Sequence, residues 1–231
     1  MVWANDFVEL TASQLTEREK TLLYGRGVSD DQISLFQIGY LRTIPEGFPE
    51  EFLQWARGVK LGDVFVFPLT TVTGAIKGFQ FRSVEREKRG YTDYFLSQDE
   101  PAMFGLHQAM PHIWESESVF LVEGVYDLAP IQRHRPDAFA TMTAKIPSNL
   151  LRMLLRLVRR IWLGYDMDQA GRKAAFGFAR EHGREFEQVK VVSYPKIHRL
   201  GSNEWIKDPG DLWETWGDTE VKKFVQFTTE S

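Results

Sequence analysis

Two hydrophobic runs in the C-terminal half of the chain are each followed at once by a cluster of acidic residues. Residues 118–122 lead into Glu123-Gly124-Val125-Tyr126-Asp127, and residues 160–165 lead into Asp166-Met167-Asp168-Gln169-Ala170-Gly171. A helical pattern follows each cluster, so the order strand, acid, helix occurs twice. Strands that alternate with helices in this way predict an α/β fold with a parallel sheet and crossover helices.

The acidic clusters are expected to lie close together, because ligands of open parallel sheets collect at the carboxyl ends of the strands. Several carboxylates in one crevice repel each other unless a cation neutralises them. Hard oxygen ligands suit Mg²⁺, which proteins usually hold through one or two carboxylates together with substrate phosphates. The pattern therefore favours a magnesium-dependent enzyme that acts on phosphates.

The overall composition restricts the class of protein. A chain of 231 residues is long enough for one large domain or two small ones. It has no cysteine, so it forms neither a disulfide nor a thiolate zinc site, and we expect no zinc in this chain. The net charge of −4 does not exclude nucleic-acid binding, because local clusters of charge decide phosphate contact. No apolar run approaches the roughly 20 residues of a membrane span, and the first residues lack a secretion signal, so we expect a cytoplasmic location and no membrane partner.

The chain is predicted to divide near residue 115. Residues 1–115 are expected to form an α+β subdomain, and residues 116–231 a parallel-sheet domain with flanking helices. In the first part we predict helices at about 16–24, 29–36 and 48–57, a β-hairpin of strands 64–69 and 75–82, and a charged loop at 83–93. In the second part we predict strands 118–122, 138–142, 160–165 and 188–193, and helices at about 127–133, 148–158 and 170–182.

The order of the acidic motifs, E-G-x-x-D after one strand and D-x-D-x-A-G two strands later, resembles the TOPRIM domain. DnaG-type primases, topoisomerases and certain nucleases share that domain. Three further regions resemble the catalytic core of the DnaG-type primases of bacteria and phages: residues 23–40, the hairpin at 67–82 and the acidic loop at 207–211. The resemblance runs in order from Leu15 to Trp216. It implies a TOPRIM Rossmann-like parallel sheet that follows helices and a β-hairpin.

The chain departs from the family pattern at several positions. Asp93 stands where the family has a lysine, Leu96 where it has an asparagine, and Met142-Thr143-Ala144 where it has LGT. Gly210 replaces the second aspartate of the DPD loop, with Asp211 one place later. The family's zinc-binding and helicase-binding domains are missing from the sequence, so we expect a minimal primase core encoded by a phage.

The resemblance implies a set of carboxylates that hold Mg²⁺ or Mn²⁺: Glu123, Asp127, Asp166, Asp168 and Asp208. Glu123, Asp166 and Asp168 would be catalytic, and a general base is an alternative role for Glu123. Asp127 and Asp168 precede predicted helices, so capping of those helices is an alternative role for both. Asp211 is an alternative to Asp208 in the acidic loop.

Several basic side chains are candidates for binding nucleotide and DNA. They are Lys77 and Arg82 on the hairpin, Arg86, Lys88 and Arg89 behind it, and Arg172 and Lys173 after the second acidic cluster. Ordinary solvated surface charge is the alternative for these residues. The same alternative applies to a basic stripe at helical spacing, which is typical of the wet face of an amphipathic helix: Arg152, Arg156, Arg159 and Arg160.

The resemblance implies a DNA-directed RNA polymerase of the DnaG primase type, which joins ribonucleotides into primers on single-stranded DNA. Its partners would be the single-stranded DNA template, ribonucleoside triphosphates, a replicative helicase and a separate zinc-binding protein for template recognition. Two alternatives stay open. One is a TOPRIM nuclease that hydrolyses phosphodiesters with the same acids, and the other is a non-catalytic DNA-binding or replisome module, which the altered positions Asp93, Leu96 and Gly210 leave possible.

Overall fold

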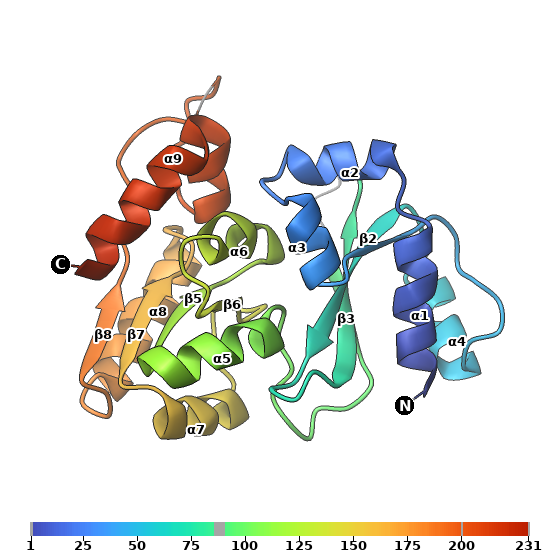
Figure 1. Cartoon of the computed structure of the whole chain (residues 1–231), viewed down its shortest axis with the longest axis horizontal. Helices are drawn as coiled ribbons and strands as arrows, with labels where there is room; N and C mark the ends of the chain where they lie inside the picture. Colours follow the sequence, from blue (N-terminus) through green and yellow to red (C-terminus); the bar gives the residue numbers. More distant parts are fainter. Residues whose placement is uncertain (1, 86–90, 200, 231) are drawn as a thin grey trace. The chain divides into compact units, whose positions relative to one another are not determined.

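The computed structural model of the chain describes residues 2–85, 91–199 and 201–230 (Figure 1). Its internal contacts separate two compact units, Met1–Gly25 with Ser29–Ala102 and Arg26–Val28 with Met103–Ser231. The predicted boundary near residue 115 falls in a helix that belongs to the second unit, and the division into two domains stays a prediction. Among the described residues, no helix has both the length and the apolar character of a membrane span. The candidate residues Arg86, Lys88 and Arg89 lie outside the described part of the chain.

The first unit combines an antiparallel sheet with short helices. The helices are α1 (Val2–Ser13), α2 (Glu17–Tyr24), α3 (Asp30–Leu35) and α4 (Glu50–Gly58). The strands are β1 (Gly39–Leu41), β2 (Val64–Thr70), β3 (Ile76–Ser83) and β4 (Tyr91–Phe95), which pair antiparallel in the order β1-β2-β3-β4. The predicted hairpin is therefore present as β2 and β3.

Two helices of this unit begin where capping signals predict. The backbone N–H of Thr16 donates to the Glu19 carboxylate at 3.2 Å before α2, and the backbone N–H of Ser29 donates to the Gln32 side chain at 3.2 Å before α3. Each reciprocal arrangement pairs backbone N–H groups that a helix start would otherwise leave without partners. Local sequence thus determines both helix starts.

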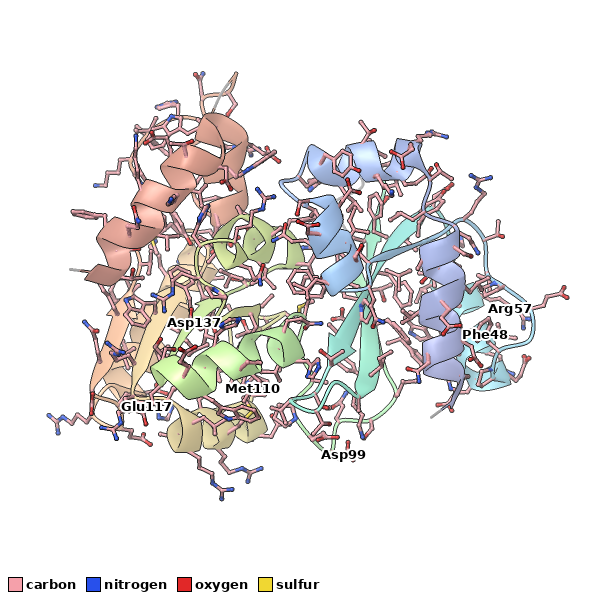
Figure 2. All side chains as sticks on the ribbon, in the orientation of Figure 1. Phe48, Arg57, Asp99, Met110, Glu117 and Asp137 are labelled. Atoms are coloured by element: carbon pink, nitrogen blue, oxygen red, sulfur yellow. The ribbon has the colours of Figure 1, made fainter. Side chains whose placement is uncertain are left out.

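Aromatic side chains form the centre of the first unit. The rings of Phe7, Phe52 and Phe79 are fully buried. Phe48, labelled in Figure 2, meets Phe7 edge to face with 5.3 Å between ring centroids. Edge-to-face contacts of this kind suit the charge distribution of aromatic rings. The N-terminal helix α1 is therefore part of the core that covers one face of the sheet, because it carries Phe7.

The sequence predicts a loop through Asp93, but strand β4 already begins at Tyr91. The side chain of Gln80 on β3 donates to the Asp93 carboxylate on β4 at 3.0 Å, in the cross-strand position that the register assigns. Tyr94 packs on the aromatic core, 4.8 Å from Trp55 between centroids. Pairing with β3 and partial burial of Tyr94 therefore override the polar local sequence.

The second unit contains a parallel sheet of order β6-β5-β7-β8, as the alternating pattern predicts. Its strands are β5 (Ser118–Val122), β6 (Ala138–Ala140), β7 (Arg160–Gly164) and β8 (Gln188–Val191), and every neighbouring pair is parallel. Its helices are α5 (Leu106–Ser116), α6 (Val125–Gln132), α7 (Ser148–Leu157), α8 (Gln169–His182) and α9 (Pro209–Glu230). Sequence patterns did not predict α5, which contains Pro111 and has no side-chain cap at its start.

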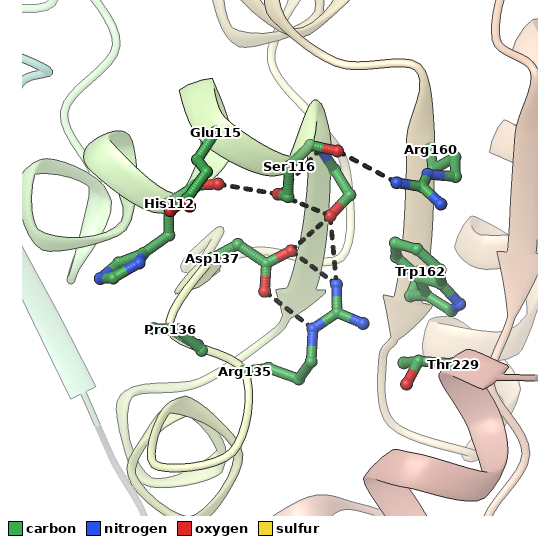
Figure 3. Close-up of a pocket in the computed structure, with 10 residues that line it drawn as sticks. His112, Glu115, Ser116, Arg135, Pro136, Asp137, Arg160, Trp162 and Thr229 are labelled. Atoms are coloured by element: carbon green, nitrogen blue, oxygen red, sulfur yellow. Dashed lines mark hydrogen bonds and ion pairs between the residues drawn. The ribbon is translucent and has the colours of Figure 1, made fainter.

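At the amino ends of these strands, Arg135 and Asp137 form a largely buried ion pair (Figure 3). The guanidinium donates to both carboxylate oxygens, with Nε to Oδ1 at 2.8 Å and Nη2 to Oδ2 at 2.5 Å. The Ser118 hydroxyl, at the start of β5, donates to Asp137 at 2.8 Å, and the Arg135 guanidinium lies 4.4 Å from the centre of the Trp162 ring. The Arg135–Asp137 ion pair thus stabilises the amino-terminal edge of the sheet.

A short stretch from the N-terminal part of the sequence, residues 26–28, belongs to the second unit. Arg133, which directly follows α6, donates from its guanidinium to the backbone carbonyl of Gly27. Gly27 has a positive φ of 79°, and a Cβ there would lie only 3.0 Å from the Trp213 ring. The guanidinium of Arg26 lies 4.6 Å from the centre of the Tyr126 ring. Glycine at position 27 therefore meets both a backbone and a packing requirement.

Candidate metal centre

The two acidic clusters follow neighbouring strands of the parallel sheet. Strands β5 and β7 pair with Val122 opposite Gly164, so Glu123 and Asp166 come just beyond the carboxyl ends of adjacent strands (Figure 1). Asp127 lies in the first turn of α6, where its carboxylate accepts from the backbone N–H of Gly124 at 3.0 Å. This placement is the one that the strand–acid–helix pattern predicts.

Three carboxylates from separate parts of the second unit converge. Within the described residues, Asp127, Asp166 and Asp208 each offer an oxygen within 4.8 Å of the others. Two ligand oxygens on opposite sides of a divalent ion, each roughly 2.0–2.6 Å from it, lie about 4–5 Å apart. The three residues are therefore spaced to hold a hard divalent cation, and their oxygen-only chemistry suits one.

Burial and mutual repulsion disfavour the ionised forms of the acids in the cluster. Burial, strengthened by the neighbouring Glu123 carboxylate, raises the pKa of Asp166 to about 6. Burial, together with the charges of Asp211 and Asp166, raises the pKa of Asp208 to about 7. Carboxyl groups with raised pKa values resist ionisation until a positive charge arrives. Without a metal ion the cluster is thus electrostatically strained near neutral pH.

Lys207, to which the sequence assigned no role, lies beside the acidic cluster. Its Nζ lies 3.8 Å from an oxygen of Asp166 and 3.8 Å from an oxygen of Asp208. Burial tends to lower the pKa of Lys207, but the carboxylates around it, Asp208 first among them, raise it overall. The available signal was its position, since it directly precedes a predicted metal ligand.

The Tyr194 hydroxyl is a second missed group near the cluster. It is buried and donates to the backbone carbonyl of Gly164 at 2.8 Å. Burial, together with the negative charges of Asp127, Asp208 and Asp166, raises the pKa of Tyr194 well above its usual value. The phenol therefore stays protonated and fixes the end of β7 as a hydrogen-bond donor.

Two glycines leave room for the carboxylates. A Cβ at Gly171 would lie 2.2 Å from the backbone oxygen of Asp166, so the first turn of α8 requires glycine where it passes Asp166. A Cβ at Gly210 would lie 3.3 Å from carboxylate oxygens of both Asp127 and Asp208. The Gly210 backbone N–H donates to Asp127 at 3.4 Å instead. Gly210, which stands where the family has an aspartate, thus places a backbone N–H donor and no side chain beside Asp127 and Asp208.

The remaining predicted metal ligands lie around the triad and are not members of it. Glu123 and Asp168 are both near enough to raise the pKa of Asp166. Asp168 also caps α8, with its carboxylate accepting from the Gly171 N–H at 2.9 Å, as the capping alternative predicts. Asp211 is buried and paired with Arg199 at 3.0 Å, so Asp208 and not Asp211 supplies the acidic loop's carboxylate to the triad.

The candidate basic residues lie in both units. In the first unit, Lys77 pairs with Asp99 at 3.4 Å and with Glu100 at 3.2 Å, and Arg82 lies on β3. In the second unit, Arg172 and Lys173 are exposed in the first part of α8. Their contacts with nucleotide or DNA stay predictions.

The basic stripe does not continue along one helix. Helix α7 ends at Leu157, so Arg152 and Arg156 are exposed on it while Arg159 and Arg160 lie beyond its end. Arg159 pairs with Glu117 at 2.8 Å and with Glu187 at 3.0 Å. Paired surface charge accounts for this residue.

Comparison with known proteins agrees with this geometry. The family model described as Toprim-like matches residues 120–205. The DNA primase of Lactococcus lactis is 25% identical over 225 residues, which cover 87% of this chain and 35% of that protein, so the chain spans about a third of that relative's length. A solved DnaG catalytic core superposes with a TM-score of 0.75 at 18% identity, covering 96% of this chain and 78% of its own. A DnaG primase catalytic domain solved with single-stranded DNA gives 0.73 at 18% identity, covering 96% and 79%.

These likenesses agree with the arrangement of the elements. The Toprim-like match runs from within β5 past β8 and includes the acids Glu123, Asp127, Asp166 and Asp168, while Asp208 follows it. The superposed cores extend over both units. The chain therefore has the fold of a DnaG-type primase catalytic core, with a Toprim-like region at residues 120–205.

Proposed function

We propose that this chain is the catalytic part of a DNA primase, a DNA-directed RNA polymerase that makes short RNA primers on single-stranded DNA. The observation that carries the proposal is the convergence of Asp127, Asp166 and Asp208 beyond the strands of the parallel sheet. The curated relatives named DNA primase support it, as does the solved DnaG domain that is bound to single-stranded DNA. The reaction class is nucleotidyl transfer.

Asp127, Asp166 and Asp208 would hold Mg²⁺ or Mn²⁺ in this reaction. When bound, such ions activate the primer hydroxyl and stabilise the charge of the leaving pyrophosphate. Glu123 and Asp168 add negative charge beside the triad, and Glu123, which directly follows β5, would act on the metal or as a general base. The protein's own contribution is to fix oxygen ligands before substrate arrives, which is electrostatic preorganisation.

Basic side chains would bind the polyanionic substrates. We assign phosphate contacts of nucleotide and DNA to Lys77, Arg82, Arg172 and Lys173. Phosphate contacts release counter-ions, so affinity for single-stranded DNA should fall steeply as salt rises. A replicative helicase and a separate zinc-binding protein for template recognition complete the proposed set of partners, in the cytoplasm of a bacterium or a phage-infected host.

The direct test is primer synthesis by the purified chain on single-stranded DNA with ribonucleoside triphosphates and Mg²⁺ or Mn²⁺. We expect Asp166→Asn to reduce synthesis by about a hundredfold or more, as the loss of a group that stabilises the reacting charges does elsewhere. The matched control is Glu187→Gln, because Glu187 is an exposed acid paired with Arg159. This control should keep full activity.

The same preparations separate the alternatives. Cleavage of labelled DNA with Mg²⁺ and no nucleotides would favour the nuclease. Two results together would favour the non-catalytic module. The unsubstituted chain would neither synthesise primers nor cleave DNA, even with candidate partner proteins added, and the Asp166→Asn variant would still bind DNA. Either result would replace the primase proposal.

A further inference from the structure

Lys207 has a fixed backbone beside the candidate metal centre. Its carbonyl accepts from the backbone N–H of Met167, in the second acidic cluster, at 2.7 Å. Its own N–H donates to the carboxylate of Asp211, at the start of α9, at 3.4 Å. The backbone is thus held between the end of β7 and the beginning of α9, and the side chain emerges at the acidic cluster.

The ammonium group of Lys207 lies where it balances two of the three carboxylates. It is 3.8 Å from oxygens of both Asp166 and Asp208, which are themselves spaced for a divalent ion. The distances are longer than those of tight ion pairs, so the ammonium lies between the two acids and is not bonded strongly to one. A divalent ion that binds both acids must therefore displace a positive charge.

The side chain has a route out of the cluster. The Lys207 side chain keeps 40% of its surface exposed, whereas those of Asp166 and Asp208 keep 21% and 13%. A lysine has a long flexible stem with a compact charge at its end, so rotation about that stem moves the charge into solvent without moving the backbone. Arg199 differs, because it is held by Asp211, Glu204 and Glu214 together.

We propose that Lys207 is an exchangeable counter-ion that sets the divalent-metal affinity of the cluster. Its ammonium balances Asp166 and Asp208 in the metal-free protein and leaves when the ion binds. This role rests on the proposed metal centre, and it makes Lys207 a positioning residue and not a ligand. The physical consequence is a lower affinity for divalent ions than the three acids alone would give. The ion must first break the interaction of Lys207 with Asp166 and Asp208, and this cost offsets part of the Coulomb energy of metal binding.

The test compares Lys207→Met, Lys207→Arg and Lys223→Met in the full chain. Lys223→Met is the matched control, because Lys223 is an exposed lysine on α9 that pairs with Glu220. Free Mn²⁺, followed by electron paramagnetic resonance, reports binding without any enzymatic turnover. Melting in EDTA at about pH 8 reports the metal-free state.

We expect Lys207→Met to bind Mn²⁺ about tenfold more tightly than the unsubstituted chain, since the ion no longer competes with a fixed charge. The same variant should melt at a lower temperature in EDTA, because two partly buried acids lose their counter-ion. Lys207→Arg should keep the original affinity within about threefold, and Lys223→Met should change neither measurement.

The outcomes separate two failures. If the unsubstituted chain binds Mn²⁺ and Lys207→Met binds it equally or more weakly, the exchange is wrong while the metal centre stands. If the unsubstituted chain binds no Mn²⁺, the metal centre fails and the exchange fails with it. Tighter binding in Lys223→Met as well would mean a general effect of net charge, which also overturns the role of Lys207.

Discussion

Replacing Asp166 with asparagine should stabilise the metal-free protein. Burial and Glu123 raise the pKa of Asp166 from 3.8 to about 6, so its ionised form is unfavourable in the folded state. The folded state binds the proton more tightly than the unfolded state, so stability falls as pH rises from about 4 to about 6 and stays reduced above that range. A difference of about two pKa units corresponds to about 3 kcal/mol, and this net value already includes the favourable charge of Lys207.

The measurement is thermal melting in EDTA at about pH 8. For a chain of this size, about 3 kcal/mol should raise the melting temperature of Asp166→Asn by roughly 6–12 °C. At about pH 4 the difference should disappear, and saturating Mn²⁺ should stabilise the original chain far more than the variant. The control is Asp137→Asn, which should instead destabilise the protein, because it leaves the buried Arg135 charge without its partner. An Asp166→Asn protein that melts at or below the original temperature at pH 8 would refute the electrostatic reasoning.

Three further outcomes are expected. Mn²⁺ affinity, measured by calorimetry, should decrease between about pH 8 and pH 6, because the raised pKa values of Asp166 and Asp208 let protons compete with the ion. Gly210→Ala should weaken Mn²⁺ binding by about tenfold with little loss of stability, because its Cβ would press on Asp127 and Asp208 oxygens at 3.3 Å. Gly171→Ala should lower the free energy of unfolding by about 1–3 kcal/mol in urea titrations, because its Cβ would lie 2.2 Å from a backbone oxygen.

Local sequence was sufficient to predict the parallel sheet and the acids at its edge. The apolar runs before Glu123 and Asp166 form adjacent strands. Both were recognisable because the strands of a βαβ arrangement are buried on both faces, so their sequences are continuously apolar. Thr16 and Ser29 similarly marked helix starts through side-chain signals only four residues long. In these places the physical cause and the sequence signal are in the same short segment.

Features that depend on distant partners were not predictable in the same way. Strand β4 forms because it pairs with β3 and partly buries Tyr94. The polar sequence of this segment does not by itself indicate a strand. Tyr194 reaches Gly164 only through the tertiary fold, and Lys207 reaches Asp166 in the same way, although its position next to Asp208 was a local signal. For the same reason sequence spacing could not decide between Asp208 and Asp211, whereas the Arg199 ion pair of Asp211 does.

Residues 26–28 have a practical consequence for expression of the second unit by itself. A fragment that starts at Met103 would lack the backbone carbonyl to which Arg133 donates and the glycine against which Trp213 packs. In that fragment the Trp213 indole and the Arg133 guanidinium would both lose a contact that they make in the full chain. Expression of the second unit alone therefore also requires residues 26–28, supplied as a synthetic tripeptide or through a grafted linker. No single cut of the polypeptide separates the two units completely.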